Sequence, residues 1–120
     1  MRAVLVISHG SRYLKTKQEL IALVASLKKK TSILLIKYAF LELESPNIME
    51  GIEQCIEEGA DGVLILLNFL NSGKHVDDDI PAILKQAKKK YPEVKFKMSR
   101  PLGLHAGVVD LFAEIIEENK

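Results

Sequence analysis

The sequence predicts an α/β fold, a doubly wound four-stranded parallel sheet with helices on both faces. Four short apolar runs alternate with segments whose apolar residues recur at helical spacing. Two of the runs, residues 3–7 and 63–67, are continuously apolar, which is typical of strands covered on both sides. No long linker, fixed repeat or low-complexity stretch interrupts the 120 residues, so we expect residues 1–120 to form one domain.

The first half of the chain is expected to hold two strands and two helices. Residues 3–7 form the first apolar run, and a helix follows from about residue 12 to residue 30, with three lysines in its last turn. Residues 33–40 give the second strand. Ser45 and the proline after it predict a helix over 46–58, because Ser is a favoured N-cap and Pro a favoured first helical residue. Cys55 lies in that helix and is expected to be a small buried hydrophobe.

The second half repeats this alternation. Residues 63–67 and 94–98 are the third and fourth strands. A loop after the third strand leads to Asp77, Asp78 and Asp79, which suit the positive end of a helix dipole in a first turn. A metal site is the alternative interpretation of this triplet. The last helix carries five apolar residues from Val108 onwards.

Composition excludes several classes of function. The formal net charge of +1 gives no support for a nucleic-acid or membrane-surface partner. The single cysteine cannot form an internal disulfide, which favours a reducing compartment. No apolar run is long enough for a secretory or transmembrane segment, so we expect a cytoplasmic protein.

Two predicted strands end in loops that carry a histidine. His9 directly follows the first strand, and His75 ends the loop after the third. Ligands bind beyond the carboxyl ends of parallel strands, so both imidazoles can face one cleft. Imidazole binds Co, Ni, Fe and Zn and also accepts protons near neutral pH. Together with Glu42, which lies past the second strand, the two histidines are chemically sufficient to bring a divalent metal to a tetrapyrrole and to remove two pyrrole protons. The alternative is structural, because a single histidine in a loop is about as often a structural hydrogen-bonding residue.

Phosphate-binding motifs are absent. Gly73-Lys74-His75 lacks the Ser or Thr that follows the lysine of a Walker loop, and Asn68 stands where that loop needs its first glycine. The glycine pattern of dinucleotide-binding folds is also missing after the first strand. A phosphoryl-transfer or nucleotide-binding module is therefore disfavoured.

Four segments together resemble the small class II chelatases, the short sirohydrochlorin cobaltochelatases and their nickel and iron relatives. The resemblance runs from Met1 to about Phe112, in order and at matching spacing, and it is carried by residues 8–12, 39–48, 69–81 and 100–105. It implies a chelatase-like fold and a homodimer with the tetrapyrrole cleft at the subunit junction. It further implies that His9 and His75 hold the metal or take pyrrole protons, and that Glu42 is an auxiliary acid, base or ligand. Ser8 stands where many relatives have Gly, and His105 is expected to be structural or peripheral.

Sirohydrochlorin carries acetate and propionate groups around its rim, so cationic and N–H groups near the two histidine loops are expected to bind it. These substrate contacts are Ser11, Arg12, Ser72, Gly73 and Lys74. The alternative for the first two is a helix cap and a surface side chain.

The predicted activity is insertion of Co²⁺ into sirohydrochlorin in anaerobic cobalamin (vitamin B12) biosynthesis, with no cofactor beyond the substrate metal. Nickel or iron insertion, for coenzyme F430 or siroheme, is the nearest alternative, since related sites accept several divalent metals. A non-catalytic carrier of metal or tetrapyrrole is the alternative from another class.

Overall fold

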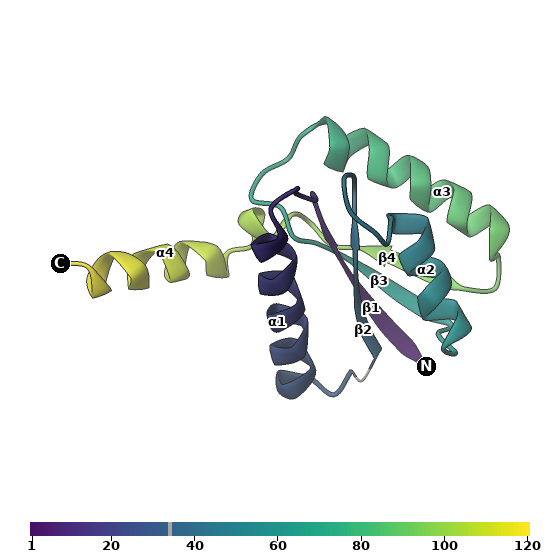
Figure 1. The fold of residues 1–120 in the computed structure, drawn as a ribbon, viewed down its shortest axis with the longest axis horizontal. Helices are drawn as coiled ribbons and strands as arrows, with labels where there is room; N and C mark the ends of the chain where they lie inside the picture. Colours follow the sequence, from purple (N-terminus) through teal and green to yellow (C-terminus); the bar gives the residue numbers. More distant parts are fainter. Residues whose placement is uncertain (34) are drawn as a thin grey trace.

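The computed structural model describes residues 1–33 and 35–120, with the side chain of His75 also outside the description. Leu34, within the predicted second strand, lies outside the described residues. The four strands are parallel and lie in the order β2-β1-β3-β4 (Figure 1). Their bounds are β1 Arg2–Ser8, β2 Leu35–Phe40, β3 Gly62–Leu67 and β4 Lys95–Met98. The predicted α/β class and parallel sheet are therefore confirmed.

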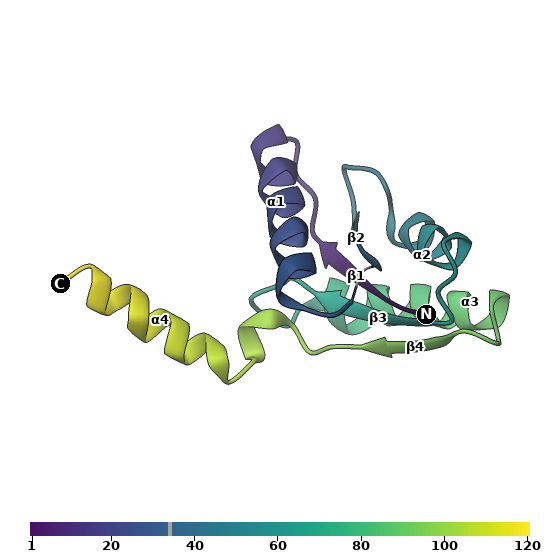
Figure 2. The same ribbon diagram turned by 90° about the horizontal axis from the view of Figure 1, so that it is seen from below.

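Helices cover the two faces of the sheet unequally. Helix α1 (Leu14–Lys30) packs on one face, where Leu20 and Val24 contact Val4 and Val6 of β1. Helices α2 (Ile48–Glu57) and α3 (Ile80–Lys90) cover the opposite face (Figure 2). Because side chains alternate along a strand, β1 serves both layers, and its whole apolar run is buried. This explains why the run shows no alternation with polar residues.

Helix α2 begins later than the sequence predicts. Asn47 is its N-cap: the Asn47 side chain accepts from the Glu50 backbone N–H at 2.8 Å, and Glu50 accepts from the Asn47 N–H at 2.9 Å. The assignment of Ser45 as N-cap is wrong, because this reciprocal pair satisfies two N–H groups that Ser45 cannot reach. The Ser45–Pro46 peptide is cis and belongs to the preceding loop. Cys55 is fully buried within α2, as predicted, and burial raises the pKa of its thiol to about 11.

The aspartate triplet lies one turn earlier than predicted. It belongs to a π-helical turn, η1 (His75–Asp79), and α3 starts only at Ile80 with Pro81 in its first turn. Among the described side chains, no group of three or more His, Cys, Asp or Glu residues is arranged to hold a metal ion. The alternative of a metal site at this triplet therefore gains no support.

The last helix covers neither face of the sheet. A short 3₁₀ turn, η2 (Leu102–Leu104), leads into α4 (Gly107–Glu118), which projects away from the body of the molecule (Figures 1 and 2). The radius of gyration is 15.0 Å, against roughly 14 Å for a compact chain of this length. Within residues 1–33 and 35–120, no helix is long and apolar enough to cross a bilayer.

Candidate functional site

Three loops meet at the carboxyl edge of the sheet where the strand order reverses. From β1 the chain passes through α1 to β2 on one side, whereas β3 pairs with the other side of β1. Such a reversal leaves a crevice beyond the strand ends, which is the usual ligand site of an open parallel sheet. His9 follows β1, Glu42 follows β2, and Asn68 follows β3. The sequence placed both His9 and Glu42 at this edge, and the structure confirms their positions.

His9 and Glu42 are in direct contact. Nε2 of His9 lies 2.8 Å from Oε1 of Glu42, and both side chains are about half exposed, at 51% and 49%. The edge of the Phe69 ring adjoins the imidazole, with ring centroids 6.5 Å apart and planes at 79°. A carboxylate in contact with one ring nitrogen can fix the orientation of an imidazole. The two side chains are thus held together at a place that solvent and ligand can reach.

The backbone around this pair continues the β1–β2 ladder past the strands. The N–H of Leu41 donates to the carbonyl of Ser8 at 2.9 Å, and the N–H of Glu42 donates to that of His9 at 3.1 Å. These bonds hold the two loops together at the level of the side-chain pair. Gly10 permits the approach, since it has a φ of +103° and a Cβ there would lie 1.8 Å from the carbonyl oxygen of Glu42.

A second set of bonds joins the ends of β1 and β3. The N–H of Asn68 donates to the Ile7 carbonyl at 2.9 Å, and Nδ2 of Asn68 donates to Oγ of Ser8 at 3.0 Å. Beside them, between α1 and the strand ends, is a hollow of about 330 Å³ whose lining includes Ser8, His9, Leu23 and Asn68. This volume is at the low end for a small-molecule pocket.

The predicted substrate contacts lie in the two loops that follow β1 and β3. Arg12, Ser72, Gly73 and Lys74 are exposed, and a Cβ at Gly73 would meet no atom within 4 Å. Their side chains and backbone are accessible to a ligand. No contact in the described residues yet assigns them a role, so their binding role remains a prediction.

Ser11 is already engaged within the protein. Its backbone N–H donates to Oε2 of Glu44 at 3.0 Å, and its Oγ accepts from the N–H of Tyr13, also at 3.0 Å. Helix α1 begins at Leu14, and its N-cap is Tyr13. The alternative that Ser11 caps this helix is therefore wrong, and the Ser11 side chain instead closes a turn just ahead of it. A carboxylate thus already binds at the spot where a substrate carboxylate was expected.

The other two histidines differ in how far they are described. His75 begins η1, in the loop after β3, but its side chain lies outside the described residues. His105 is exposed, and its Nδ1 accepts from the N–H of Gly107 at 2.9 Å, at the start of α4. His105 therefore has a structural contact at the start of α4, and the peripheral role expected for it stays a prediction.

Sequence reasoning missed several residues that shape this edge. Asn68 directly follows β3 and Gly10 lies two residues after β1, so their position near a strand end is a signal that could have been used. The contacts of Phe69 with His9 and of Glu44 with Ser11 depend on loop geometry, and nothing in the linear sequence indicates them.

Comparison with known proteins gives matches along nearly the whole chain. A family model described as CbiX matches residues 3–119. A sirohydrochlorin ferrochelatase of Priestia megaterium is 35% identical over 98% of this chain, and the chain spans 44% of its length. A sirohydrochlorin cobaltochelatase of Sulfolobus acidocaldarius is 30% identical over 98% of this chain and 92% of its own. The crystal structure of the sirohydrochlorin chelatase SirB from Bacillus subtilis subspecies spizizenii, in complex with cobalt, is 30% identical with a TM-score of 0.86, covering 98% of this chain and 50% of that chain.

Proposed function

Because the chain belongs to the CbiX family, we propose that it is a chelatase that inserts a divalent metal ion into sirohydrochlorin. Relatives named for this activity match 98% of the chain at 30–35% identity. The chain spans about half or less of the length of several of them, 44% for the Priestia megaterium ferrochelatase. The observation that carries the proposal is the His9–Glu42 pair at the reversal point of the strand order.

The reaction exchanges a metal ion for two protons. As M²⁺ enters the macrocycle, two pyrrole N–H bonds break, and the protons leave to a base and then to water. The Glu42 carboxylate, 2.8 Å from Nε2 of His9, can orient the imidazole ring. We assign His9 to hold the incoming metal or accept a pyrrole proton. Glu42 orients that ring and receives the proton in turn.

His75 is proposed as the second metal ligand. Its backbone lies in η1, which follows the loop after β3. Strand β3 is the neighbour of β1, the strand that His9 follows. Two imidazoles suit Co²⁺, Ni²⁺ and Fe²⁺ alike, because all three bind nitrogen ligands. The metal is a substrate in this scheme, and no further cofactor is invoked.

The rim carboxylates of sirohydrochlorin are proposed to bind Arg12, Ser72, Gly73 and Lys74, which are exposed in the loops that follow β1 and β3. Arg12 suits a bidentate pair with a carboxylate. Ser11 is proposed to join them when a substrate carboxylate replaces the Glu44 carboxylate on its N–H. This exchange retains one carboxylate at that N–H throughout.

A homodimer is the proposed working unit. The hollow next to His9 has a volume of only about 330 Å³, which suits part of a tetrapyrrole and leaves the rest to a second surface. The Sulfolobus acidocaldarius relative, which the chain covers over 92% of its length, indicates that chelatases of this size exist. We further propose a cytoplasmic location, on the ground of the single cysteine.

Cobalt is the proposed metal, for cobalamin biosynthesis. Relatives with similar identity are named both cobaltochelatase and ferrochelatase, so iron, and nickel by the same ligand chemistry, are the alternatives. Which of these metals occupies the site depends on the supply of each metal in the cell as well as on its affinity for the ligands.

An anaerobic absorbance assay tests the proposal. Purified protein is mixed with sirohydrochlorin and Co²⁺, Ni²⁺ or Fe²⁺ at equal free concentration, beside reactions without protein. Acceleration over those controls supports a chelatase, and the order of rates selects the metal. Binding of sirohydrochlorin without acceleration by any metal would overturn the proposal in favour of a carrier.

A further inference from the structure

Leu43, the residue after Glu42, has an unusual backbone conformation. Its φ is +68°, and it is the one residue other than glycine with a positive φ in the described part of the chain. The N–H of Glu44 donates to the carbonyl of Glu42 at 2.8 Å, so these three residues form a γ-turn with Leu43 at its centre. A γ-turn with a positive central φ is the rare and strained form, which glycine adopts far more readily than leucine. The backbone of Leu43 is therefore strained.

Burial does not compensate this strain. The Leu43 side chain is 57% exposed, and neither apolar cluster of the described core includes it. Leu41, two residues earlier, does pack against the core, on the side of α2 and α3. An apolar side chain stabilises a fold in proportion to the area that it removes from water. The stability of the fold thus gives no reason for a leucine at the centre of this turn.

The γ-turn is held in place by the loop after β1. The N–H of Glu42 donates to the carbonyl of His9 at 3.1 Å, and Oε2 of Glu44 accepts from the N–H of Ser11 at 3.0 Å. Strained backbone of this kind persists only where the surrounding contacts fix it, and it is concentrated at sites that bind ligands. Leu43 therefore presents an apolar side chain to solvent from a fixed backbone, directly beside Glu42 in the chain.

The other loops at the carboxyl edge carry exposed apolar side chains as well. These are Tyr13 after β1, Leu70 after β3, and Leu102 and Leu104 after β4. The last two belong to η2, which is seated on the loop after β3, because the N–H of Gly103 donates to the Phe69 carbonyl at 3.0 Å. With Leu43 after β2, each of the four loops at this edge has an apolar side chain that a ligand can cover.

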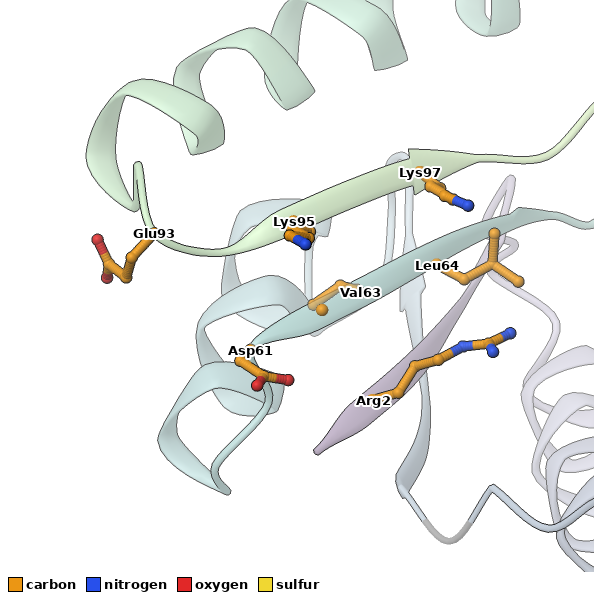
Figure 3. A pocket seen from close by; sticks show the side chains of 8 residues that line it. Arg2, Asp61, Val63, Leu64, Glu93, Lys95 and Lys97 are labelled. Atoms are coloured by element: carbon orange, nitrogen blue, oxygen red, sulfur yellow. The ribbon is translucent and has the colours of Figure 1, made fainter.

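A larger hollow on the same chain is different in character. It has a volume of about 450 Å³, lies along β3 and β4, and is lined mainly by charged side chains of both signs (Figure 3). These are Arg2, Asp61, Glu93, Lys95 and Lys97. A ligand with a broad apolar face would remove water from these charges there, which costs free energy. The carboxyl edge is the more favourable surface for such a ligand.

We propose that Leu43 contacts the flat face of the sirohydrochlorin macrocycle beside the His9–Glu42 pair. The inference rests on the proposed function, because it takes the tetrapyrrole as the substrate. A conjugated macrocycle is apolar on its two faces and carries its carboxylates at the rim, so cations and N–H groups suit the rim and apolar side chains suit the faces. A fixed turn loses little conformational freedom on binding, which favours affinity. Leu43 is then a substrate-binding residue without a part in proton transfer.

A metal-free titration tests the contact. Binding of sirohydrochlorin is followed by absorbance under anaerobic conditions. Leu43→Ala keeps a Cβ and the backbone strain but loses the apolar contact, and it is expected to raise the Kd about tenfold. Leu43→Met has a similar volume and should retain the affinity. The loss in Leu43→Ala should be equal at low and high salt, because ions do not screen an apolar contact.

Ile21→Ala is the matched control for loss of an exposed apolar side chain. Ile21 is 46% exposed and lies in the middle of α1. This variant should bind sirohydrochlorin as the unmodified protein does. A Kd raised equally in Ile21→Ala and Leu43→Ala would overturn the proposal, by showing that the loss is not specific to the turn.

Leu43→Gly separates binding from folding. Glycine adopts the γ-turn without strain, so the thermal unfolding midpoint should equal or exceed that of the unmodified protein, while the Kd for sirohydrochlorin rises as in Leu43→Ala. A midpoint lower by more than about 4 °C would overturn the proposal, by showing that the side chain stabilises the fold.

Metal insertion by the same variants distinguishes this inference from the proposed function. Where insertion occurs, Leu43→Ala should raise KM and leave kcat nearly unchanged, as for a contact made equally before and during the reaction. Insertion by the unmodified protein with an unchanged Kd in Leu43→Ala overturns the contact and leaves the chelatase standing. Weaker binding in Leu43→Ala without insertion by the unmodified protein supports the contact and overturns the chelatase. Absence of sirohydrochlorin binding by the unmodified protein overturns both.

Discussion

The backbone of Gly10 is packed directly against the carbonyl of Glu42, so that a Cβ atom on Gly10 would lie 1.8 Å from that oxygen. Gly10→Ala must push the Glu42 loop away, at a φ of +103° that L-residues rarely adopt. We expect a loss in the free energy of unfolding of more than about 1 kcal/mol, together with slower metal insertion. Thermal unfolding and the absorbance assay measure the two effects.

Gly59→Ala is the matched control for this change. Gly59 has the same φ of +103°, but a Cβ there would meet nothing within 4 Å. It therefore reports the backbone strain without the clash, and we expect a smaller loss of stability and unchanged metal insertion. Equal losses in the two variants would show that crowding against Glu42 has no energetic weight.

Replacement of His9 by Ala is expected to slow metal insertion by about 100-fold or more, the usual range for loss of a group that transfers protons. Glu42→Gln should slow it less, because the amide can still contact the imidazole but cannot take its proton. If the two residues act as a unit, the double variant will be little slower than His9→Ala alone.

His105→Ala is the control for these variants, because the interaction described for the His105 side chain is with the N–H of Gly107 at the start of α4. The initial rate of metal insertion is measured for each purified variant, after its mass and its circular dichroism spectrum have been compared with those of the unmodified protein. Full activity in His9→Ala would remove His9 from the mechanism.

The reciprocal bonds between Asn47 and Glu50 predict a local effect on stability. Asn47→Ala removes the N-cap of α2 and is expected to lower the free energy of unfolding by about 1 kcal/mol. Ser45→Ala should change it little, because the Ser45 side chain makes no cap. Denaturant unfolding of both variants compares them directly, and a larger loss in Ser45→Ala would contradict the assigned cap.

Burial of Cys55 makes stability depend on pH in the alkaline range. The thiol has an ordinary pKa of 9.0 and one of about 11 in the folded protein, so between these values the folded state binds the proton more tightly. Its contribution is complete below pH 9 and is lost as the pH rises towards 11. Unfolding midpoints of the unmodified protein should therefore fall more steeply between pH 9 and pH 11 than those of Cys55→Ala. Parallel curves would contradict the effect of burial.

Periodicity was enough to predict the strands, because the apolar run of β1 is buried on both faces, and β3, whose residues alternate between buried and half-buried, carries no polar side chain. It also placed His9 and Glu42 correctly, since a residue that follows a parallel strand must lie at the carboxyl edge. The contact between their side chains was not predictable, because it depends on Gly10 and on the turn that carries Leu43 at a φ of +68°. Both are features of the folded loops.

The errors have equally specific causes. Ser45 and Asn47 are both residue types that are favoured as N-caps, so residue preference alone does not identify the cap of α2. The cap is determined by the reciprocal hydrogen bonds between Asn47 and Glu50. The direction of α4 was not predicted, because an amphipathic pattern shows that one side of a helix is apolar but does not show where the helix lies relative to the sheet. The seat of η2 on the loop after β3 determines that direction.

The strand order has a consequence for biogenesis. β1 is synthesised first, yet it lies between β2 and β3. Its apolar run therefore has a pairing partner on one side once residue 40 is made and on the other only after residue 67. During translation more than half of the chain must emerge from the ribosome before the centre of the sheet can close. Until then the nascent chain exposes an unpaired hydrophobic strand edge, the kind of surface that chaperones protect.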